Sequence, residues 1–357
     1  MTDSFSQGHQ RRPRYRGTHP QRFMERYKER DPARYPDMEA HIRAQGRTPA
    51  GGHVPVLLDA VMAALDPKPG ETVADVTIGY GGHAAEFLKR IGPGGRLLGM
   101  DRDGVELEKA GSRLEAFVAS VTLAHGNFAG LGRAAARAGF PVLDILFADL
   151  GVSSMQLDDP ARGFSHKHDG PLDMRMDPAG RHTAADVLAA ISEVDLAAAL
   201  RDLADEPDAA RIARAIVVAW SARPILRTTE LAALVCAEKG VSGRPGGDFA
   251  RGAHPAARTF QTLRMLVNRE GENLAALLRD ANYLLAPGGR IGIISFHSGE
   301  DRRVKRAFLD GLAAGVYRMV AESPVRAGPE EVRSNPRARP AKFRWAVRTS
   351  SPGDARP

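Results

Sequence analysis

The stretch that decides the fold of this chain reads Asp75-Val76-Thr77-Ile78-Gly79-Tyr80-Gly81-Gly82-His83. An apolar run typical of a β-strand leads into it (residues 72–76), and a helical pattern follows it (residues 83–91). An acid at a strand end, a glycine-rich turn and a helix start are how α/β enzymes bind nucleotide-like cofactors. The glycines let a ligand approach the main-chain N–H groups closely, because no Cβ intervenes.

A second acidic residue, Asp101, strengthens the prediction of a cofactor site. It ends the next predicted strand, residues 96–101. A carboxylate at this point of an α/β sheet can accept hydrogen bonds from both hydroxyl groups of a ribose. A glycine-rich turn alone is a weak signal, but an acid at the next strand end favours a nucleoside-containing cofactor.

Strands and helices alternate through the first part of the chain, which is typical of a parallel, doubly wound sheet. After the first strand, the predicted strands are 96–101, 121–124 and 142–149, and the predicted helices are 83–91, 104–118 and 130–138. The fourth strand ends in Asp149, so three strands bring an acid to one edge. Ligands of such sheets bind at the carboxyl ends of the strands, and we expect the acids to surround the site.

The strand pattern stops near residue 155 and returns after residue 254. Only helical patterns lie between, and a strand (290–295), a helix (299–311) and a last strand (343–347) follow. This order predicts one α/β domain interrupted by a helical, substrate-binding insert. The predicted organisation is a basic, disordered extension (1–52), the first part of the α/β domain (53–154), the helical insert (155–254), and the second part with the C-terminal tail (255–357).

The composition indicates a globular protein without disulfides. The 357 residues are 43% hydrophobic and 26% charged, which suits a chain with a substantial core. No apolar run approaches the roughly 18 residues that cross a bilayer, and the N-terminus lacks the apolar core of a secretory signal. We therefore expect a cytoplasmic protein with no membrane partner. The single cysteine, Cys236, cannot form an intrachain disulfide or a cysteine-based metal cluster.

Most of the formal net charge of +7 lies in the first fifty residues. Ten arginines and one lysine stand there against six acids, with aromatic residues between them. Such a segment can contact phosphates and stack on bases, or it can be a solvated extension with no partner of its own. Several prolines argue against a folded unit there.

Asp149 is the first candidate for catalysis, because it ends a strand beside the expected cofactor. The lone pair of an exocyclic amino group on cytosine or adenine is delocalised into the ring. A positioned acceptor draws that nitrogen toward sp³ geometry and frees the lone pair for in-line attack on a methyl group. Asp149 can equally be a cofactor contact or a structural residue.

His297 is the second, tentative candidate. It leaves the fifth strand in the same neighbourhood and can move a proton, hold a phosphate or be purely structural. His166 and His168 lie in a loop without acids of fixed geometry, and such a pair rarely binds a metal. The loop 162–177 either offers Phe164 and arginines to a nucleic acid or covers the cofactor.

Together these motifs resemble the bacterial small-subunit rRNA cytosine-N4 methyltransferases, the RsmH (MraW) family. The resemblance covers about residues 53–348 and leaves out residues 1–52. It rests on Val56-Leu57-Leu58-Asp59, Gly79-Tyr80-Gly81-Gly82-His83, Asp101-Arg102-Asp103, His125-Gly126-Asn127-Phe128, Asp149-Leu150-Gly151-Val152-Ser153-Ser154, Gln156-Leu157-Asp158-Asp159, Arg162-Gly163-Phe164-Ser165, Arg258-Thr259-Phe260-Gln261 and Ser295-Phe296-His297-Ser298.

The resemblance implies a class I S-adenosylmethionine-dependent methyltransferase, with a Rossmann-like, mostly parallel sheet as the methyltransferase domain and an all-helical inserted domain. The cofactor would be S-adenosyl-L-methionine, with no metal. The substrate would be the exocyclic N4 of a decoding-centre cytosine in 16S rRNA within the small ribosomal subunit. The cofactor-binding residues would be Gly81, Gly82, His83, Asp101, Phe128, Asp149 and Gln156.

The sequence departs from the family pattern at two places. Val76 and Ile78 stand where the family usually has a glycine and an aromatic residue. Residues 204–208 replace an acidic Gly-Glu-Glu segment. Either change can alter the shape of a loop, but neither removes a proposed cofactor contact.

Three other functions stay open on the sequence. A nicotinamide-dependent dehydrogenase would carry Gly-x-Gly-x-x-Gly directly after the first strand, and the spacing from Asp75 to Gly82 differs. A ribosome-assembly factor would bind RNA without methyl transfer, and a methyltransferase could instead act on adenine or a protein nitrogen. The single Cys236 disfavours a thiolate mechanism at cytosine C5 and radical chemistry with a cysteine-held cluster. The sequence does not set the oligomeric state.

Overall fold

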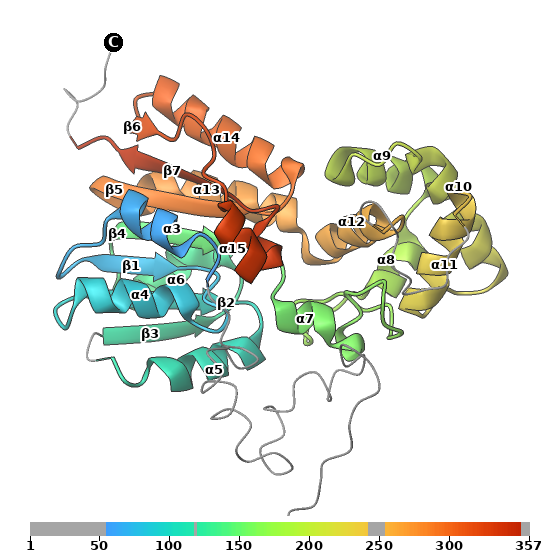
Figure 1. Ribbon diagram of the computed structural model, residues 1–357, viewed down its shortest axis with the longest axis horizontal. Coiled ribbons are helices and arrows are strands. Elements are labelled where there is room, and N and C mark those ends of the chain that lie inside the picture. The colour runs from blue at the N-terminus through green and yellow to red at the C-terminus, as the bar shows by residue number, and fades with distance from the viewer. Residues whose placement is uncertain (1–54, 118–119, 242–253, 351–357) are drawn as a thin grey trace, which may run out of the picture. The chain divides into compact units, whose positions relative to one another are not determined.

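A seven-stranded sheet forms the centre of the α/β part of the computed structural model, which describes residues 55–117, 120–241 and 254–350 (Figure 1). The predicted extension, residues 1–52, lies outside the described residues. The strand order is β3-β2-β1-β4-β5-β7-β6, and only β7 runs antiparallel to its neighbours. The strands are β1 (Thr72–Asp75), β2 (Arg96–Asp101), β3 (Ser120–His125), β4 (Leu143–Asp149), β5 (Leu285–Ser295), β6 (Tyr317–Val320) and β7 (Lys342–Arg348).

The strand order reverses between β1 and β4, because β1 pairs with β2 on one side and with β4 on the other. Ligands of open α/β sheets bind at the carboxyl ends of the strands at such a point. Asp75 and Asp149 end the two strands beside it, and Asp101 ends β2. The prediction of a Rossmann-like, mostly parallel sheet is confirmed, with its acids at the expected edge.

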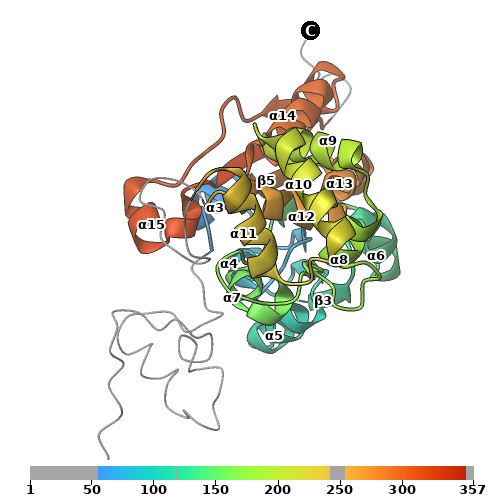
Figure 2. The same cartoon turned by 90° about the vertical axis from the view of Figure 1, so that its right-hand side faces the viewer.

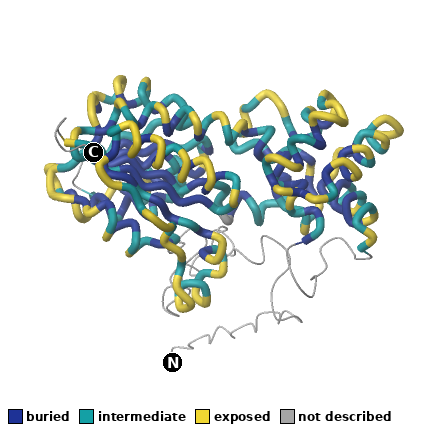
Figure 3. Tube along the Cα trace, turned by 90° about the horizontal axis from the view of Figure 1, so that it is seen from above, coloured by how far each residue is buried: buried dark blue, intermediate teal, exposed yellow. Residues whose placement is uncertain are grey.

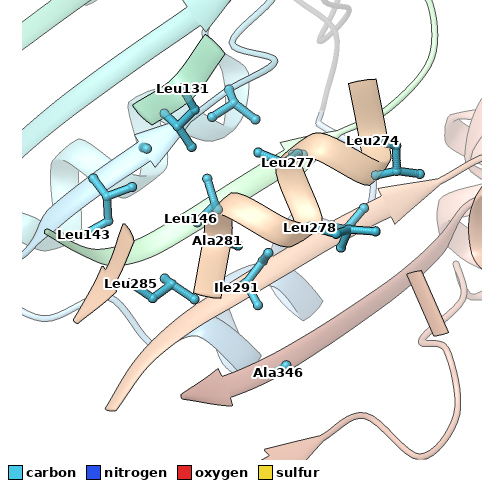
Figure 4. Close-up of a cluster of buried hydrophobic side chains, with 14 of the residues drawn as sticks. Leu131, Leu143, Leu146, Leu274, Leu277, Leu278, Ala281, Leu285, Ile291 and Ala346 are labelled. Carbon is cyan, nitrogen blue, oxygen red and sulfur yellow. The ribbon is translucent and has the colours of Figure 1, made fainter. Parts of the chain in front are cut away.

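Helices cover both faces of the sheet. On one face α3 (Leu58–Leu65), α4 (Gly82–Ile91) and α5 (Gly104–Leu114) share a buried apolar cluster with the strands. On the other face α6 (Leu131–Arg137), α13 (Glu270–Leu284) and α14 (Ser298–Ala313) share a second cluster. Figure 4 shows leucines of α13 packed against Leu146 and Ile291 of the central strands. Each fully buried leucine of this kind contributes about 1.5–3 kcal/mol to stability.

Burial follows the sheet closely, since the central strands are dark along most of their length in Figure 3. Residues 145–148 of β4 are buried one after another, so both faces of this strand are covered. A continuous apolar run, rather than an alternating one, is what a central parallel strand requires.

The helices between β4 and β5 have an apolar core of their own. Five of the helices between these strands share this core and form a helical group: α8 (Ala184–Ala190), α9 (Glu193–Ala204), α10 (Ala209–Ala222), α11 (Thr228–Glu238) and α12 (Ala257–Asn268) (Figure 2). Phe260 and Leu263 of α12 belong to this core, so the helical group continues past residue 254. The domain boundaries drawn from the sequence stay predictions, and residues 242–253 lie outside the described chain.

Short elements are where the structure departs from the sequence-based expectations. The strand β6 and the helices α7 (Ser154–Asp158) and α15 (Pro329–Ser334) were not predicted, because so few residues show no readable periodicity. The helix predicted over 104–118 ends at Leu114. Among the described helices, none has the length and apolar character needed to span a membrane.

Candidate active site

A cavity of about 260 Å³ opens at the carboxyl edge of the sheet. Loops that follow β1, β2, β3, β4 and β5 line it, and so do single residues of the helical group and of the segment around α15. A second cavity, beside α14 and β7, measures about 10 Å³ and has room for about one water molecule. The larger cavity is therefore the candidate ligand site, at the edge where the sequence places it.

The β1–α4 turn forms one wall of the cavity. Gly81 precedes α4 with φ of 80°, a conformation that favours glycine, and its N–H donates to the carbonyl of Ile78 at 2.7 Å. Gly82 and His83 line the cavity, whereas Gly81 faces the side chain of Leu114. The turn thus places helix α4 with its amino end at the cavity, where main-chain N–H groups favour an anionic or polar ligand.

The two departures from the family pattern in this turn are core residues. Val76 and Ile78 are both buried, and they pack into the clusters on opposite faces of the sheet. Ile78 occupies the space above Gly99, where an added Cβ would lie 2.3 Å from its Cδ1. Gly99 therefore makes room for the isoleucine.

Asp101 is held in one orientation by two main-chain donors. Its Oδ2 accepts a hydrogen bond from Gly79 N at 2.8 Å, and its Oδ1 accepts one from Asp103 N at 2.8 Å. Burial raises the pKa of Asp101 to about 6, against the effect of these two donors. An oriented carboxylate of this kind at the end of β2 can accept hydrogen bonds from a ribose.

Asp149 and His83 face each other without a donor between them. His83 Nε2 lies 3.0 Å from the carbonyl of Val56 and must carry the proton there, so Nδ1 is an acceptor. That Nδ1 lies 3.9 Å from Asp149 Oδ2, and Asp149 Oδ1 is buried with no hydrogen-bond partner in the described part of the chain. Burial lowers the pKa of His83 to about 4, so the imidazole is neutral.

The environment of Asp149 therefore calls for a cationic or hydrogen-bond-donating ligand. Burial, and the nearby charge of Glu300, raise the pKa of Asp149 to about 7. A buried acceptor without a donor costs about 1–3 kcal/mol. A positively charged ligand group would remove that cost, and a cationic amino-acid group of a cofactor fits this requirement.

Phe128 and Gln156 also border the cavity. Phe128 begins a 3-10 turn (Phe128–Gly130) after β3. Gln156 is buried, its Nε2 donates to Asp103 Oδ2 at 2.9 Å, and its Oε1 accepts from Ser153 N at 2.9 Å. Both polar atoms of the Gln156 side chain are thus bonded within the protein. A ligand would meet this side chain mainly through van der Waals contact.

His297 does not lie on the described cavity wall, and its position does not support the predicted catalytic role. It caps the start of α14, where its Nδ1 accepts from Glu300 N at 3.4 Å, and its Nε2 lies 3.1 Å from Glu300 Oε1. Glu300 was not predicted as a site residue from the sequence, but it lines the cavity. Its Oε2 accepts a hydrogen bond from Phe296 N at 3.1 Å. The sequence signal for Glu300 is its place three positions after His297, the N-cap of α14, because an acid at that position is typical of a helix start.

Three groups able to bind a metal lie close together, and two of them, Glu270 and Glu300, line the cavity. The ligand atoms of Glu270, His297 and Glu300 are within 4.8 Å of one another. However, Arg264 binds both oxygens of Glu270 at 2.8 Å, so a cation is already in place. His166 packs against His254 with ring centroids 4.1 Å apart, and no acid completes a site there in the described chain. We do not propose a metal at either place.

The loop after α7 is a cover rather than a stacking surface. Phe164 is 5% exposed and belongs to the apolar core of the helical group, so it is not free to stack on a base. Two arginines of the helical group have acidic partners: Arg211 pairs with Asp208, and Arg223 with Glu230. These ion pairs lie on the exposed surface, and none of their four residues lines the cavity.

The mostly parallel seven-stranded sheet with its antiparallel β7 is that of a class I methyltransferase, and the cavity lies at its carboxyl edge. The chain belongs to the MraW methylase family, which matches residues 50–349. Its methyl donor is S-adenosylmethionine, and the dehydrogenase alternative is set aside.

Close relatives span nearly the whole chain. The ribosomal RNA small subunit methyltransferase H 1 of Lachnoclostridium phytofermentans is 41% identical over 345 residues, 95% of this chain and 93% of that protein. The ribosomal RNA small subunit methyltransferase H 2 of Alkaliphilus metalliredigens is 41% identical over 351 residues, 97% and 99% of the two chains. The ribosomal RNA small subunit methyltransferase H of Koribacter versatilis is 43% identical over 303 residues, 83% and 94% of the two.

Proposed function

We propose that this protein transfers the methyl group of S-adenosylmethionine to the exocyclic N4 of a decoding-centre cytosine in 16S rRNA. The relatives named above are small-subunit rRNA methyltransferases, which supports an rRNA substrate. The observation that supports a cationic cofactor is the acceptor pair of Asp149 and His83 on the cavity wall, where Asp149 Oδ1 has no hydrogen-bond partner among the described residues. We further propose that the protein acts in the cytoplasm, on 16S rRNA of the small ribosomal subunit.

The residues at the end of β1, β2 and β4 would hold the cofactor. Asp101 would accept hydrogen bonds from the ribose, and Phe128 and Gln156 would border the adenosine. Gly82 and His83 would border the amino-acid end, with Gly81 shaping the turn from behind, and Asp149 would accept from the ammonium group. When bound, the cofactor supplies an electrophilic methyl group on a cationic sulfur.

Four further residues of the cavity lining suit the acceptor base: Phe296, Glu300, Arg303 and Arg337. A carboxylate is the side chain that accepts from the N4 amino group of cytosine, an aromatic ring can stack on the base, and arginines bind phosphates. With Asp149 facing the cofactor, Glu300 is the better-placed acceptor for the amino group, and His297 would hold Glu300 in position.

This arrangement would orient the amino nitrogen for in-line attack. A hydrogen bond from N4 to a carboxylate draws its lone pair out of the ring, which is the same role first assigned to Asp149 from the sequence. The burial of Glu300, 5% exposed, keeps water away from the acceptor and strengthens that hydrogen bond.

Mass spectrometry of the methylated product tests the proposal. Under-methylated small subunits and free 16S rRNA would each be incubated with the protein and isotope-labelled S-adenosylmethionine, and the nucleosides analysed. N4-methylcytidine from the small subunit is the expected product. Label in adenine or in protein would show that the methyl acceptor is not cytosine N4. RNA binding without any methyl transfer would indicate a ribosome-assembly factor instead of an enzyme.

A further inference from the structure

Three consecutive residues at the end of β2 connect the cofactor site to the helical group. The first is Asp101, the proposed ribose contact. The third, Asp103, is 1% exposed, and its Oδ1 accepts from Val105 N at 3.1 Å at the start of α5. Its Oδ2 accepts two hydrogen bonds from beyond β4, from Gln156 Nε2 at 2.9 Å and from Arg162 Nη1 at 2.7 Å.

The charge of Asp103 is stabilised by these partners. Burial raises the pKa of Asp103, but the hydrogen bonds from Gln156 and Arg162 outweigh it and hold the pKa below its usual value. Because Asp103 N also donates to Asp101 Oδ1 at 2.8 Å, whatever orders Asp103 also orders the acid that faces the cavity.

Arg162 joins this strand end to two parts of the loop after α7. Its Nη1 binds Asp103, and its Nη2 donates to the carbonyls of Met176 at 2.7 Å and Arg175 at 3.1 Å. Arg162 itself does not line the described cavity, but Gln156 and Met176 do. A single guanidinium, 19% exposed, therefore fixes two separate pieces of the cavity wall.

The middle residue, Arg102, holds the other connection of the helical group. Its Nη1 donates to the carbonyl of Asn268, the last residue of α12, at 2.7 Å. The Asn268 side chain accepts from Met176 N at 2.9 Å and donates to the carbonyl of Met174 at 2.7 Å. Both chain segments that bound the helical group thus meet at the end of β2.

We propose that Arg162 is a positioning residue that couples cofactor binding to the placement of the helical group. The proposal rests on the proposed cofactor contact of Asp101. Cofactor bound at Asp101 would stabilise the end of β2, including Asp103. Asp103 would in turn hold Gln156 directly and Met176 through Arg162. The substrate-facing side of the protein would then be set before the RNA arrives.

Binding of S-adenosylhomocysteine to variants, measured by calorimetry, tests the coupling. Arg162→Met is expected to raise the dissociation constant about tenfold, within the range of coupling between sites, and Arg162→Lys about threefold. Arg227→Met is the matched control, because Arg227 forms an ion pair with Asp169 away from β2 and is expected to leave the dissociation constant unchanged.

Hydrogen exchange supplies a readout that a merely structural residue would not move. In the wild type, S-adenosylhomocysteine is expected to slow amide exchange across residues 155–177, and in Arg162→Met this ligand-dependent slowing is expected to be lost. Should Arg162→Met fail to fold, Arg162→Lys and Asp103→Asn carry the same comparison.

The possible outcomes separate the two proposals. A wild type that does not bind S-adenosylhomocysteine would overturn the proposed function. A wild type that binds it, together with Arg162 variants of equal affinity and equal ligand-dependent protection, would overturn the coupling alone.

Discussion

Two sets of partly or fully buried carboxylates in this protein have pKa values shifted in opposite directions. Burial raises the pKa of Asp101 to about 6 and, together with the charge of Glu300, that of Asp149 to about 7 at the sheet edge. Burial acts the same way on Asp103 and Asp301, but hydrogen bonds from arginines, with further donors, hold the pKa of both below the usual value. The difference is a cationic partner, which the first set lacks among the described residues and the second set has.

That difference separates residues that hold the fold from residues kept for a ligand. A buried charge paired with an arginine is satisfied within the protein, and breaking the pair is costly. A buried carboxylate without a cation weakens the free protein and is stabilised when a cationic ligand binds. The carboxylates of the proposed S-adenosylmethionine site, Asp101 and Asp149, have no cationic partner among the described residues. Asp103, which connects this site to the helical group, is paired with an arginine.

The largest effect is expected from breaking a paired carboxylate that does not line the cavity. Arg344 Nε lies 2.6 Å from Asp301 Oδ1, and both side chains are almost fully buried. Arg344→Met should lower the free energy of unfolding by about 3 kcal/mol, because Asp301 would keep only Lys342 as a partner. Urea unfolding measures this change in the free energy of unfolding. A loss below about 0.5 kcal/mol, typical of an exposed pair, would mean that the arginine-paired carboxylates do not stabilise the fold.

The next effect is expected from an unpaired carboxylate, and on catalysis instead of stability. Asp149→Asn keeps the shape of the side chain but removes the charge beside His83. With S-adenosylmethionine below its dissociation constant, methyl transfer should fall about a hundredfold, equivalent to about 2.7 kcal/mol, because the ammonium group loses a charged acceptor, while the melting temperature stays the same or rises. Single-turnover rates and thermal unfolding test both halves, and a variant that loses stability as Arg344→Met does would place Asp149 among the structural acids.

Asp101→Ala should affect binding and leave the fold intact. Removing a charged acceptor from the ribose should weaken cofactor binding about twentyfold, or about 2 kcal/mol. Glu86→Ala is the control, because Glu86 pairs with Lys89 on the outer side of α4. Calorimetry with S-adenosylmethionine measures both variants, and unchanged affinity in Asp101→Ala would refute the ribose assignment.

The sheet and its acid-bearing edge could be predicted from the sequence because their signals are local. Each predicted strand end, at Asp75, Asp101 and Asp149, is a run of neighbouring residues whose pattern can be read without knowing the fold. The same holds for the glycine turn before α4.

Contacts between distant residues could not be predicted in this way. Arg162 and Asp103 are 59 positions apart, and nothing in either motif shows that they meet. Phe164 has the chemistry of a stacking residue, and only tertiary packing reveals that it is buried. His297 and Glu300 lie within one turn, but which of them faces the cavity depends on how α14 meets the sheet.

The smallest of these predicted effects on affinity is a pH dependence, which has the opposite sign for the stability of the free protein. The pKa values of Asp101, about 6, and Asp149, about 7, lie above the ordinary value of 3.8, so the free folded protein holds protons that the unfolded chain releases. Stability of the free protein should therefore fall as the pH rises from about 4 to about 7. A cationic ligand favours the ionised carboxylates, so affinity for S-adenosylmethionine should rise over the same interval.

Between pH 5.5 and 7.5 the affinity gain is expected to be about tenfold, or about 1.4 kcal/mol. Calorimetry in buffers of different ionisation enthalpy should show protons released on binding near pH 6.5, and Asp101→Asn should release fewer. Paired acids such as Asp103 are already ionised in this interval, so they cannot produce the effect. Affinity that stays flat with pH, or proton uptake in place of release, would mean that the sheet-edge carboxylates are not the groups that meet the cofactor.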